Sequence, residues 1–158
     1  MRDLPYPHPT SAAVSAVMRA NRKTGSSPEV GVRRALFHLG LRFRKNLAIR
    51  MAGVQVRPDV VFTRQRVAIF IDGCFWHACP DHGNVPRANT LYWAPKLERN
   101  VARDQQVDRR LTLMGWTVVR VWEHVPPADA AALIAESVRK AAAAPSPDRS
   151  GTSIDQSD

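Results

Sequence analysis

Two short apolar runs, at residues 58–62 and 67–71, limit the possible folds of this chain more than any other feature. Only Thr-Arg-Gln-Arg separates them, so we expect two neighbouring strands. Apolar runs of this length are typical of strands in the centre of a sheet. The rest of the chain must therefore supply elements that cover them.

Helical patterns surround the two expected strands. Ser27 can cap a helix that has Pro28 at its first position and ends at Gly40. Residues 47–56 indicate a loop or a wide hairpin. The other expected elements are helices over residues 10–22, 92–114 and 126–144 and strands over residues 41–46 and 116–122. The fold class is therefore α/β, with a small mixed central sheet flanked by helices.

The length of 158 residues is typical of one compact domain with short tails. Residues 1–9 contain three prolines and form the expected irregular N-terminal arm, and the single domain covers residues 10–144. Residues 145–158 are rich in Ser, Asp and Pro, which predicts a disordered tail. No apolar run is long enough for a membrane span and the N-terminus lacks the apolar core of a secretory signal, so we expect a cytoplasmic protein.

The positive charge of the chain is concentrated in its first half. Residues 1–66 hold thirteen Lys and Arg against three acids, whereas residues 67–158 hold ten basic and eleven acidic residues. A basic half favours a polyanion partner, because cations that contact phosphates release counterions. The alternative is ordinary solvated surface charge. Anionic lipid is disfavoured, since no long basic amphipathic helix is evident.

Three acidic residues are candidates for binding a divalent metal. Asp59 opens the first apolar strand, Asp72 lies at the far end of the next strand, and Glu29 borders the apolar stripe of its helix. A carboxylate at a strand end is a suitable Mg²⁺ ligand, and such an ion can activate water and neutralise charge on a phosphate. Each acid also has a structural alternative, as a helix-dipole partner or a turn residue. Their order along the chain favours a nuclease.

Two thiols and two imidazoles lie within residues 74–82, inside a long irregular segment. In a cytoplasmic protein this spacing favours a metal over a disulfide, and four such ligands in tetrahedral geometry are typical of Zn²⁺. Three ligands are Cys74, Cys79 and His82. The fourth is either His77 or His124, and we favour His124 because a distant ligand would fasten the loop to the sheet. The alternative is two buried thiols beside surface histidines.

His77 is then available for proton transfer or for contact with a phosphate, because an imidazole titrates near neutrality. Two aromatic pairs lie close to it in the sequence: Phe75 and Trp76 within the metal segment, and Tyr92 and Trp93 just beyond it. Aromatic side chains on loops can wedge between base pairs, although packing in the core is their ordinary role. The polar surroundings favour the wedge.

Two polar residues interrupt the apolar arc of the helix expected over residues 92–114. Asn100 and Asp104 share that arc with Leu97, Val101 and Leu111. Polar residues in such positions are either buried structural groups or members of a site. For Asp104 we expect the structural role.

Together these residues resemble the very short patch repair (Vsr) family of DNA endonucleases. The Gly-Cys-Phe-Trp-His block is highly specific, and the matching segments follow the family order over residues 14–125. They are Val17-Met18-Arg19, Ser27-Pro28-Glu29, Leu39-Gly40-Leu41-Arg42-Phe43-Arg44, Arg57-Pro58-Asp59-Val60-Val61, Gly73-Cys74-Phe75-Trp76-His77, Tyr92-Trp93, Arg99-Asn100-Val101-Ala102-Arg103-Asp104, Gly115-Trp116 and Val121-Trp122-Glu123-His124.

The resemblance implies a restriction-endonuclease-like core and a Mg²⁺-dependent nick 5′ to the T of a T:G mismatch, left by deamination of 5-methylcytosine. Asp59 would bind the metal with the backbone carbonyl of Ile71, Glu29 would hold a metal-bound water, and His77 would assist at the phosphate. Structural Zn²⁺ would be bound by Cys74, Cys79, His82 and His124. The DNA-binding residues would be Met18, Phe75, Trp76, Trp93, Lys96 and Asn100.

The chain departs from the family pattern in three respects. Residues 83–91 match only loosely, which leaves the recognised sequence context open. Asp72 stands where well-known members carry the first histidine of a pair, so we count it among the catalytic residues, as a metal ligand or as an acid/base. Cys79 stands where a histidine is familiar and His124 where a cysteine is, and both changes keep zinc chemistry possible.

We expect a monomer that acts on mismatched double-stranded DNA in the nucleoid, with other mismatch-repair proteins as candidate partners. One alternative is a nuclease of the same fold with a restriction or defence role and another specificity. A second is a DNA-binding module held together by zinc that does not cleave. The presence of Glu29, Asp59 and His77 argues against the second.

Overall fold

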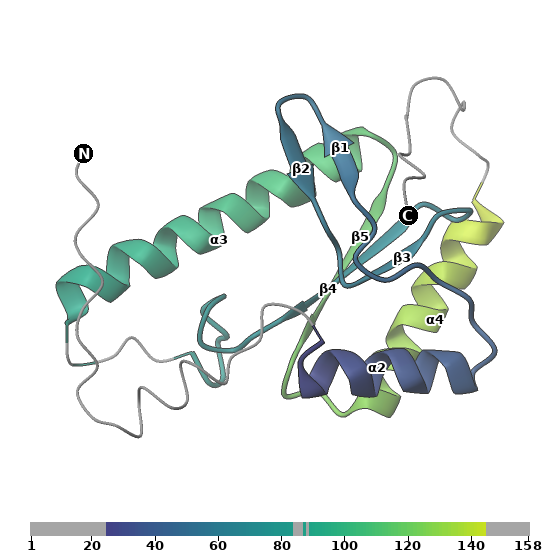
Figure 1. The fold of residues 1–158 in the computed structure, drawn as a ribbon, viewed down its shortest axis with the longest axis horizontal. Coiled ribbons are helices and arrows are strands. Elements are labelled where there is room, and N and C mark those ends of the chain that lie inside the picture. The colour runs from purple at the N-terminus through teal and green to yellow at the C-terminus, as the bar shows by residue number, and fades with distance from the viewer. Residues whose placement is uncertain (1–24, 84–86, 88, 145–158) are drawn as a thin grey trace.

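The computed structural model describes residues 25–83, 87 and 89–144, and it has the expected α/β architecture (Figure 1). The helix expected over residues 10–22, the N-terminal arm and the C-terminal tail lie outside the described residues. Within the described part, no helix is long and apolar enough to cross a membrane. The elements in order are α2 (Ser27–His38), β1 (Ile49–Met51), β2 (Val54–Val56), β3 (Val60–Phe62), β4 (Val67–Asp72), α3 (Thr90–Leu113), β5 (Thr117–Trp122) and α4 (Pro127–Ala143).

The two central strands are confirmed, and a third strand completes their sheet. The strand order is β3-β4-β5, with β3 antiparallel and β5 parallel to β4. The register places Asp72 opposite Trp122, so β4 and β5 end at the same edge of the sheet. Asp59 precedes β3 at that same edge, because antiparallel strands start where their partners finish.

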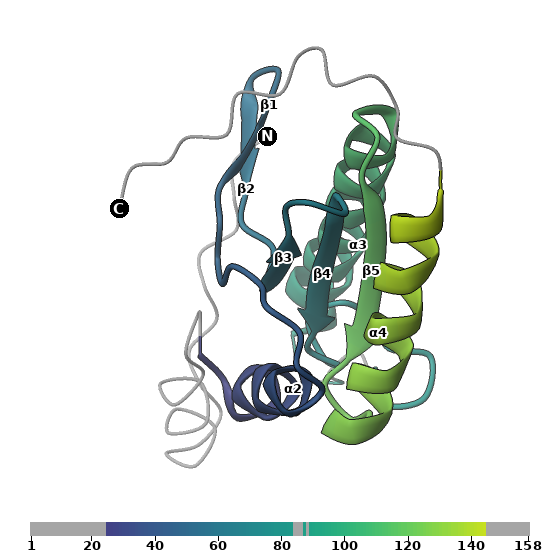
Figure 2. The same ribbon diagram turned by 90° about the vertical axis from the view of Figure 1, so that its right-hand side faces the viewer.

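Each face of the sheet packs against a separate apolar cluster. Val60, Ile69 and Val121 pack on the side of α2 and α4, whereas Val61 and Ala68 pack on the side of α3 and the β1–β2 hairpin. Successive strand residues point to opposite faces, which explains this division. Figure 2 shows α3 and α4 on opposite sides of the sheet, and in Figure 1 α3 extends past the end of β4.

Three local expectations need correction. The cap of α2 is Ser26 rather than Ser27, and its hydroxyl accepts a 3.5 Å hydrogen bond from the backbone of Glu29. Leu39 continues the apolar spacing of Val32, Ala35 and Leu36 and was therefore expected to be buried with them, but it is the C-cap residue of α2 and is 56% exposed. Residues 41–46 form only an isolated bridge between Arg44 and Val61, so they run along the edge of β3 without forming a strand.

A glycine allows the two helices on one face to pack closely. At Gly31 of α2, a Cβ atom would lie 2.9 Å from Cγ of Pro127 at the start of α4. Side-chain carbons cannot approach so closely without a shift of one helix. The contact fixes the start of α2, and with it Glu29, relative to the end of β5.

Candidate active site

Asp59 lies at the sheet edge where β4 ends, and its environment disfavours its negative charge. Its Oδ2 accepts a 2.7 Å hydrogen bond from the backbone N–H of Ile71, and its carbonyl accepts bonds from Arg33. Burial raises the pKa of Asp59 to about 6 in spite of the Ile71 bond, and the charges of Glu29 and Asp72 add to the increase. A bound cation would relieve this repulsion, so the residues fit a hard divalent metal.

Glu29 is buried in the first turn of α2, with 6% of its surface exposed. It accepts hydrogen bonds of 2.7 Å from the backbone of Gly25 and 3.0 Å from the hydroxyl of Ser26. Arg33, one turn later, lies 3.2 Å from it and also binds the carbonyl of Asp59. The arginine thereby joins α2 to the start of β3. Our sequence interpretation missed Arg33, although its position four residues after Glu29 was an available signal.

His77 forms an ion pair with Asp104 through Nδ1, and the same nitrogen is 3.8 Å from Oδ1 of Asp72. Burial alone would lower the pKa of His77, but the bond to Asp104 and the charge of Asp72 outweigh it and raise that pKa. Burial alone would raise the pKa of Asp104, but the hydrogen bond and charge of His77 outweigh it and lower that pKa. Asp104 therefore does more than the structural role we expected, because its contact orients the imidazole of His77 and favours the charged form.

Asp72 is brought to the same edge, but it is paired with a residue that the sequence interpretation did not include. Asp72 is 5% exposed, and both of its oxygens contact Nη1 of Arg120, at 2.8 Å and 2.9 Å. Burial raises the pKa of Asp72, and the charge and hydrogen bonds of Arg120 counteract that effect. Arg120 is a basic residue in the middle of the otherwise apolar strand β5, and that position could have indicated a buried acidic partner.

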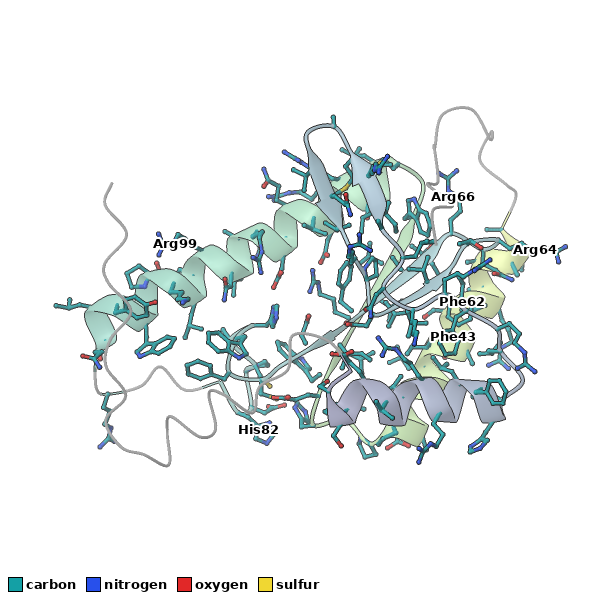
Figure 3. All side chains as sticks on the ribbon, viewed as in Figure 1. Phe43, Phe62, Arg64, Arg66, His82 and Arg99 are labelled. Carbon is teal, nitrogen blue, oxygen red and sulfur yellow. The ribbon has the colours of Figure 1, made fainter. Side chains whose placement is uncertain are left out.

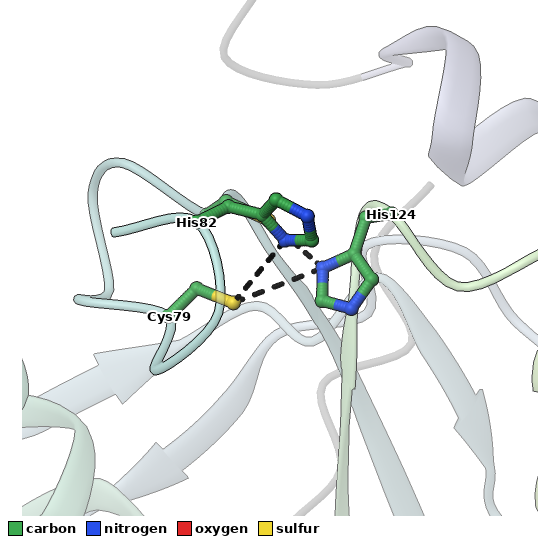
Figure 4. A group of neighbouring side chains, drawn as sticks. Cys79, His82 and His124 are labelled. Atoms are coloured by element: carbon green, nitrogen blue, oxygen red, sulfur yellow. Dashed lines mark hydrogen bonds between the residues drawn. The ribbon is translucent and has the colours of Figure 1, made fainter. Parts of the chain in front are cut away.

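The predicted zinc ligands come together at the ends of β4 and β5. The ligand atoms of Cys74, Cys79, His82 and His124 all lie within 4.8 Å of one another. Figure 4 shows both imidazole rings turned toward the Cys79 sulfur, whose Sγ lies 3.9 Å from Nδ1 of His82 and 3.7 Å from Nδ1 of His124. The contact with His124 links the loop to the end of β5. Of the two alternatives for the fourth ligand, His124 is the one that belongs to this group.

The spacing of these ligands suits a tetrahedral ion. The Sγ of Cys74 lies 3.1 Å from Nδ1 of His124, and the Sγ of Cys79 lies 3.7 Å from that nitrogen and 3.9 Å from Nδ1 of His82. Zinc bonded to sulfur and nitrogen at its usual distances would place them about 3.6 Å apart. Burial and the adjacent Cys79 raise the pKa of Cys74 to about 11, so a metal must displace protons to bind.

Three of the aromatic residues expected to contact DNA form one cluster. The ring centroids of Phe75 and Trp76 are 4.9 Å apart, and Trp93 lies 5.4 Å and 5.9 Å from them in edge-to-face contacts. Trp93 is 4% exposed, whereas the other two rings are half-buried. Trp93 therefore supports the two rings that can reach a ligand.

The first turns of α3 hold this cluster in place. Asn100 donates a 3.1 Å hydrogen bond to the carbonyl of Trp76, which ties the metal segment to the helix. The ammonium of Lys96 is 2.9 Å from the hydroxyl of Tyr92 and 5.5 Å from the Trp93 ring. A cation is thus held beside the aromatic surface. Met18, the remaining expected DNA contact, lies outside the described residues.

The opposite end of the sheet has a different chemical character. Arg64 and Arg66 lie in the turn between β3 and β4, away from His82 at the other end of the strands (Figure 3). A groove of about 400 Å³ beside them contains Phe43 and Phe62 and no acidic residue among its described lining. The carboxylates that we consider as metal ligands instead lie at the other end of these strands, at Asp59 and Asp72.

Known proteins match this chain over most of its length. The family model described as DNA mismatch endonuclease Vsr matches residues 8–81. The type II nicking enzyme V.NaeI of Lentzea aerocolonigenes is 53% identical over 134 residues, which cover 84% of this chain and 81% of that protein. The DNA mismatch endonuclease Vsr of Escherichia coli (strain K12) is 36% identical over 113 residues, which cover 71% and 70% of the two chains. The type II nicking enzyme V.NmeDIP of Neisseria meningitidis serogroup C is 37% identical over 109 residues, which cover 68% and 71%.

A mixed α/β fold with clustered acids at one sheet edge, in a chain similar to enzymes that cut DNA, defines the class of protein as a DNA endonuclease. The family-model match includes Glu29, Asp59, Asp72 and both cysteines. The chain belongs to the Vsr family.

Proposed function

We propose that this protein is a Mg²⁺-dependent endonuclease that nicks one DNA strand 5′ to the T of a T:G mismatch, in very short patch repair. The observation that carries the proposal is the edge of the sheet, where Asp59 has a pKa raised to about 6 near Glu29 and Asp72, and where His77, paired with Asp104, lies 3.8 Å from Asp72. The name of the E. coli relative supports the mismatch specificity. The restriction-endonuclease-like core is part of the same proposal.

Asp59 and the carbonyl of Ile71 would hold the metal, with Glu29 reaching it through water. Bound there, Mg²⁺ supplies charge neutralisation at the phosphate and an acidified water. Hydrolysis adds water across one P–O bond, so the leaving oxygen must gain a proton. His77 is suited to donate a hydrogen bond or a proton to a phosphate oxygen, because Asp104 binds Nδ1 and favours the charged imidazole.

The mismatch would be recognised by the aromatic cluster. A mismatched pair is easier to unstack than a matched pair, so a rigid apolar wedge can select it. Phe75 and Trp76 form the accessible part of this wedge, with Trp93 behind them and Lys96 and Asn100 beside the bases. Met18 contributes from the N-terminal segment.

The zinc ion has a structural role in this proposal. Bound by Cys74, Cys79, His82 and His124, it would fix the segment that carries both His77 and the wedge. We further propose that residues 10–144 form the single domain, with residues 1–9 and 145–158 as tails. The protein would act as a cytoplasmic, nucleoid-associated monomer, alongside other mismatch-repair proteins.

Cleavage of a T:G duplex compared with a T:A duplex tests the proposed function. The wild type should nick the T strand of the mismatch in Mg²⁺ and leave the matched duplex intact. Asp59→Asn should remove nicking and retain DNA binding, whereas Asp129→Asn, at an exposed position on α4, should behave like the wild type. Equal cleavage of both duplexes would refute the mismatch specificity.

A second candidate is a nuclease of the same family with a restriction or defence role. It is favoured by the names of V.NaeI and V.NmeDIP, both of which are type II nicking enzymes. Nicking of a matched duplex at a defined sequence would support it. Binding without any cleavage in Mg²⁺ would instead support the zinc-containing DNA-binding module.

A further inference from the structure

Arg120 lies among three carboxylates on the α3 side of the sheet, and the proposed chemistry makes no use of it. Its Nη1 contacts both oxygens of Asp72, at 2.8 Å and 2.9 Å. Its Nε and Nη2 lie 2.9 Å to 3.0 Å from the oxygens of Asp108, and Nη2 is also 3.7 Å from Oδ1 of Asp104. Each nitrogen of the guanidinium therefore has an acidic partner.

The fold brings these groups together from three elements, β4, β5 and α3. Arg120 pairs with Phe70 in the β4–β5 register, and its guanidinium lies 4.5 Å from the centroid of that ring. Asp72 is two residues beyond Phe70, so it points to the same face of the sheet. Asp104 and Asp108 are one turn apart on α3 and face that side. Arg120 therefore joins the end of β4 to the helix that orients His77.

This pairing makes Asp72 a different kind of group from Asp59. Both oxygens of Asp72 are held by a guanidinium whose charge compensates its own. The Oδ2 of Asp59 accepts a hydrogen bond from the neutral backbone N–H of Ile71, and the nearby Arg33 binds the backbone carbonyl of Asp59 rather than its carboxylate. The charge of Arg33 favours the ionised Asp59, whereas the charges of Glu29 and Asp72 oppose it. A hard cation gains most from a carboxylate whose charge is not already compensated. Asp59 meets that condition and Asp72 does not.

We propose that Arg120 withholds Asp72 from the metal, so that Asp59 is the aspartate that binds the divalent cation and Asp72 is a positioning residue held between Arg120 and His77. The inference rests on the proposed function for the existence of the metal site. It assigns Asp72 neither of the roles considered from the sequence, metal ligand or acid/base.

Mn²⁺ binding to the zinc-loaded protein without DNA, followed by electron paramagnetic resonance, tests the inference independently of activity. Asp59→Asn should weaken Mn²⁺ binding by at least about tenfold, whereas Asp72→Asn should leave it unchanged within error. Arg120→Met should strengthen Mn²⁺ binding, because it frees the Asp72 carboxylate, and the double variant with Asp72→Asn should return it to the wild-type value. Arg139→Met, at an exposed position on α4, is the matched control.

Two results would overturn the inference: a loss of Mn²⁺ affinity in Asp72→Asn equal to that in Asp59→Asn, or unchanged affinity in a folded Arg120→Met protein. If Arg120→Met does not fold, the Mn²⁺ affinity of Asp72→Asn decides whether Asp72 binds the metal. The conservative variant Arg120→Lys should then keep the wild-type Mn²⁺ affinity. A protein that shows the expected pattern but nicks no DNA refutes the proposed function and leaves the inference in place. A wild type that binds no Mn²⁺ overturns both.

Discussion

At the scale of single residues, Asp59 carries a negative charge where its surroundings oppose one. Burial is the largest cause, and it raises the pKa of this carboxyl from 3.8 to about 6. Such a difference corresponds to about 3 kcal/mol of unfavourable ionisation at neutral pH. Unfavourably placed charges of this kind are common in groups that bind a ligand or take part in a reaction.

Asp59→Asn should therefore stabilise the protein while it removes nicking. The folded-state pKa lies above the unfolded one, so the stabilisation from the protonated form is lost as pH rises from about 4 to about 6. Without added Mg²⁺ at pH 7.5, urea unfolding should show the variant to be more stable by about 1–3 kcal/mol. The difference should shrink at pH 5. A variant less stable than the wild type at pH 7.5 would contradict this account.

The pair formed by His77 and Asp104 should determine the pH dependence of nicking. Asp104 raises the pKa of His77, so a reaction that needs the charged imidazole proceeds until the pH exceeds that raised value. Asp104→Asn should move the alkaline limb of the pH–rate profile to lower pH. Asp129→Asn is the control, and an unmoved limb in Asp104→Asn would show that the charged form is not required.

At the scale of elements, the segment between β4 and α3 depends on tight backbone packing as well as on zinc. A Cβ at Gly83 would lie 2.5 Å from the carbonyl oxygen of Cys79, so no side chain fits there without moving a proposed ligand. The backbone N–H of Gly83 donates a 2.7 Å bond to that same carbonyl. The glycine thus belongs to the metal segment although it ligates nothing.

Gly83→Ala and Cys74→Ala should both release zinc and lower the melting temperature, because a structural ion contributes folding free energy. Zinc content by mass spectrometry and thermal unfolding measure the two effects. Gly53→Ala is the matched control: Gly53 has a φ of +73°, so alanine there is strained, but nothing lies within 4 Å of its Cβ position. Gly53→Ala should keep its zinc. A wild type without zinc would reject the site.

The proposed wedge combines rings from the metal segment and from α3. Because the wedge would act on the unstacked mismatch, removing one of its rings should affect specificity more than affinity. Trp76→Ala should reduce the ratio of T:G to T:A cleavage, because unstacking then loses its apolar partner. Gel-shift affinity for a matched duplex should change little, since phosphate contacts dominate it. Cleavage ratios equal to those of the wild type would assign Trp76 to packing alone.

At the scale of the whole molecule, the charge of +9 makes DNA affinity an electrostatic property. An endonuclease with roughly six phosphate contacts would lose about a thousandfold in affinity between about 50 mM and 200 mM salt. Fluorescence anisotropy with a T:G duplex should show that dependence, and the T:A duplex should show nearly the same slope. A DNA affinity that does not change with salt concentration would contradict the proposal that the basic half of the chain binds DNA phosphates.

Much of this molecule is determined locally, and the sequence alone was enough for those parts. The apolar runs of β3 and β4, the long α3 and the clustered Cys and His residues follow from periodicity and spacing, which act over short distances. The cap at Ser26 and the absent strand at residues 41–46 were missed, because neighbouring contacts decide them.

Only the tertiary structure could decide how the acids are divided between roles. Asp59, Asp72 and Asp104 look alike in a sequence, and their ionisation depends on partners from α2, β5 and the metal segment. Arg120 pairs with Asp72 across 48 positions of the chain, and no local pattern specifies such a pair. The physical reason is that charge interactions depend on distance and burial in space, which the fold sets after the helices and strands have formed.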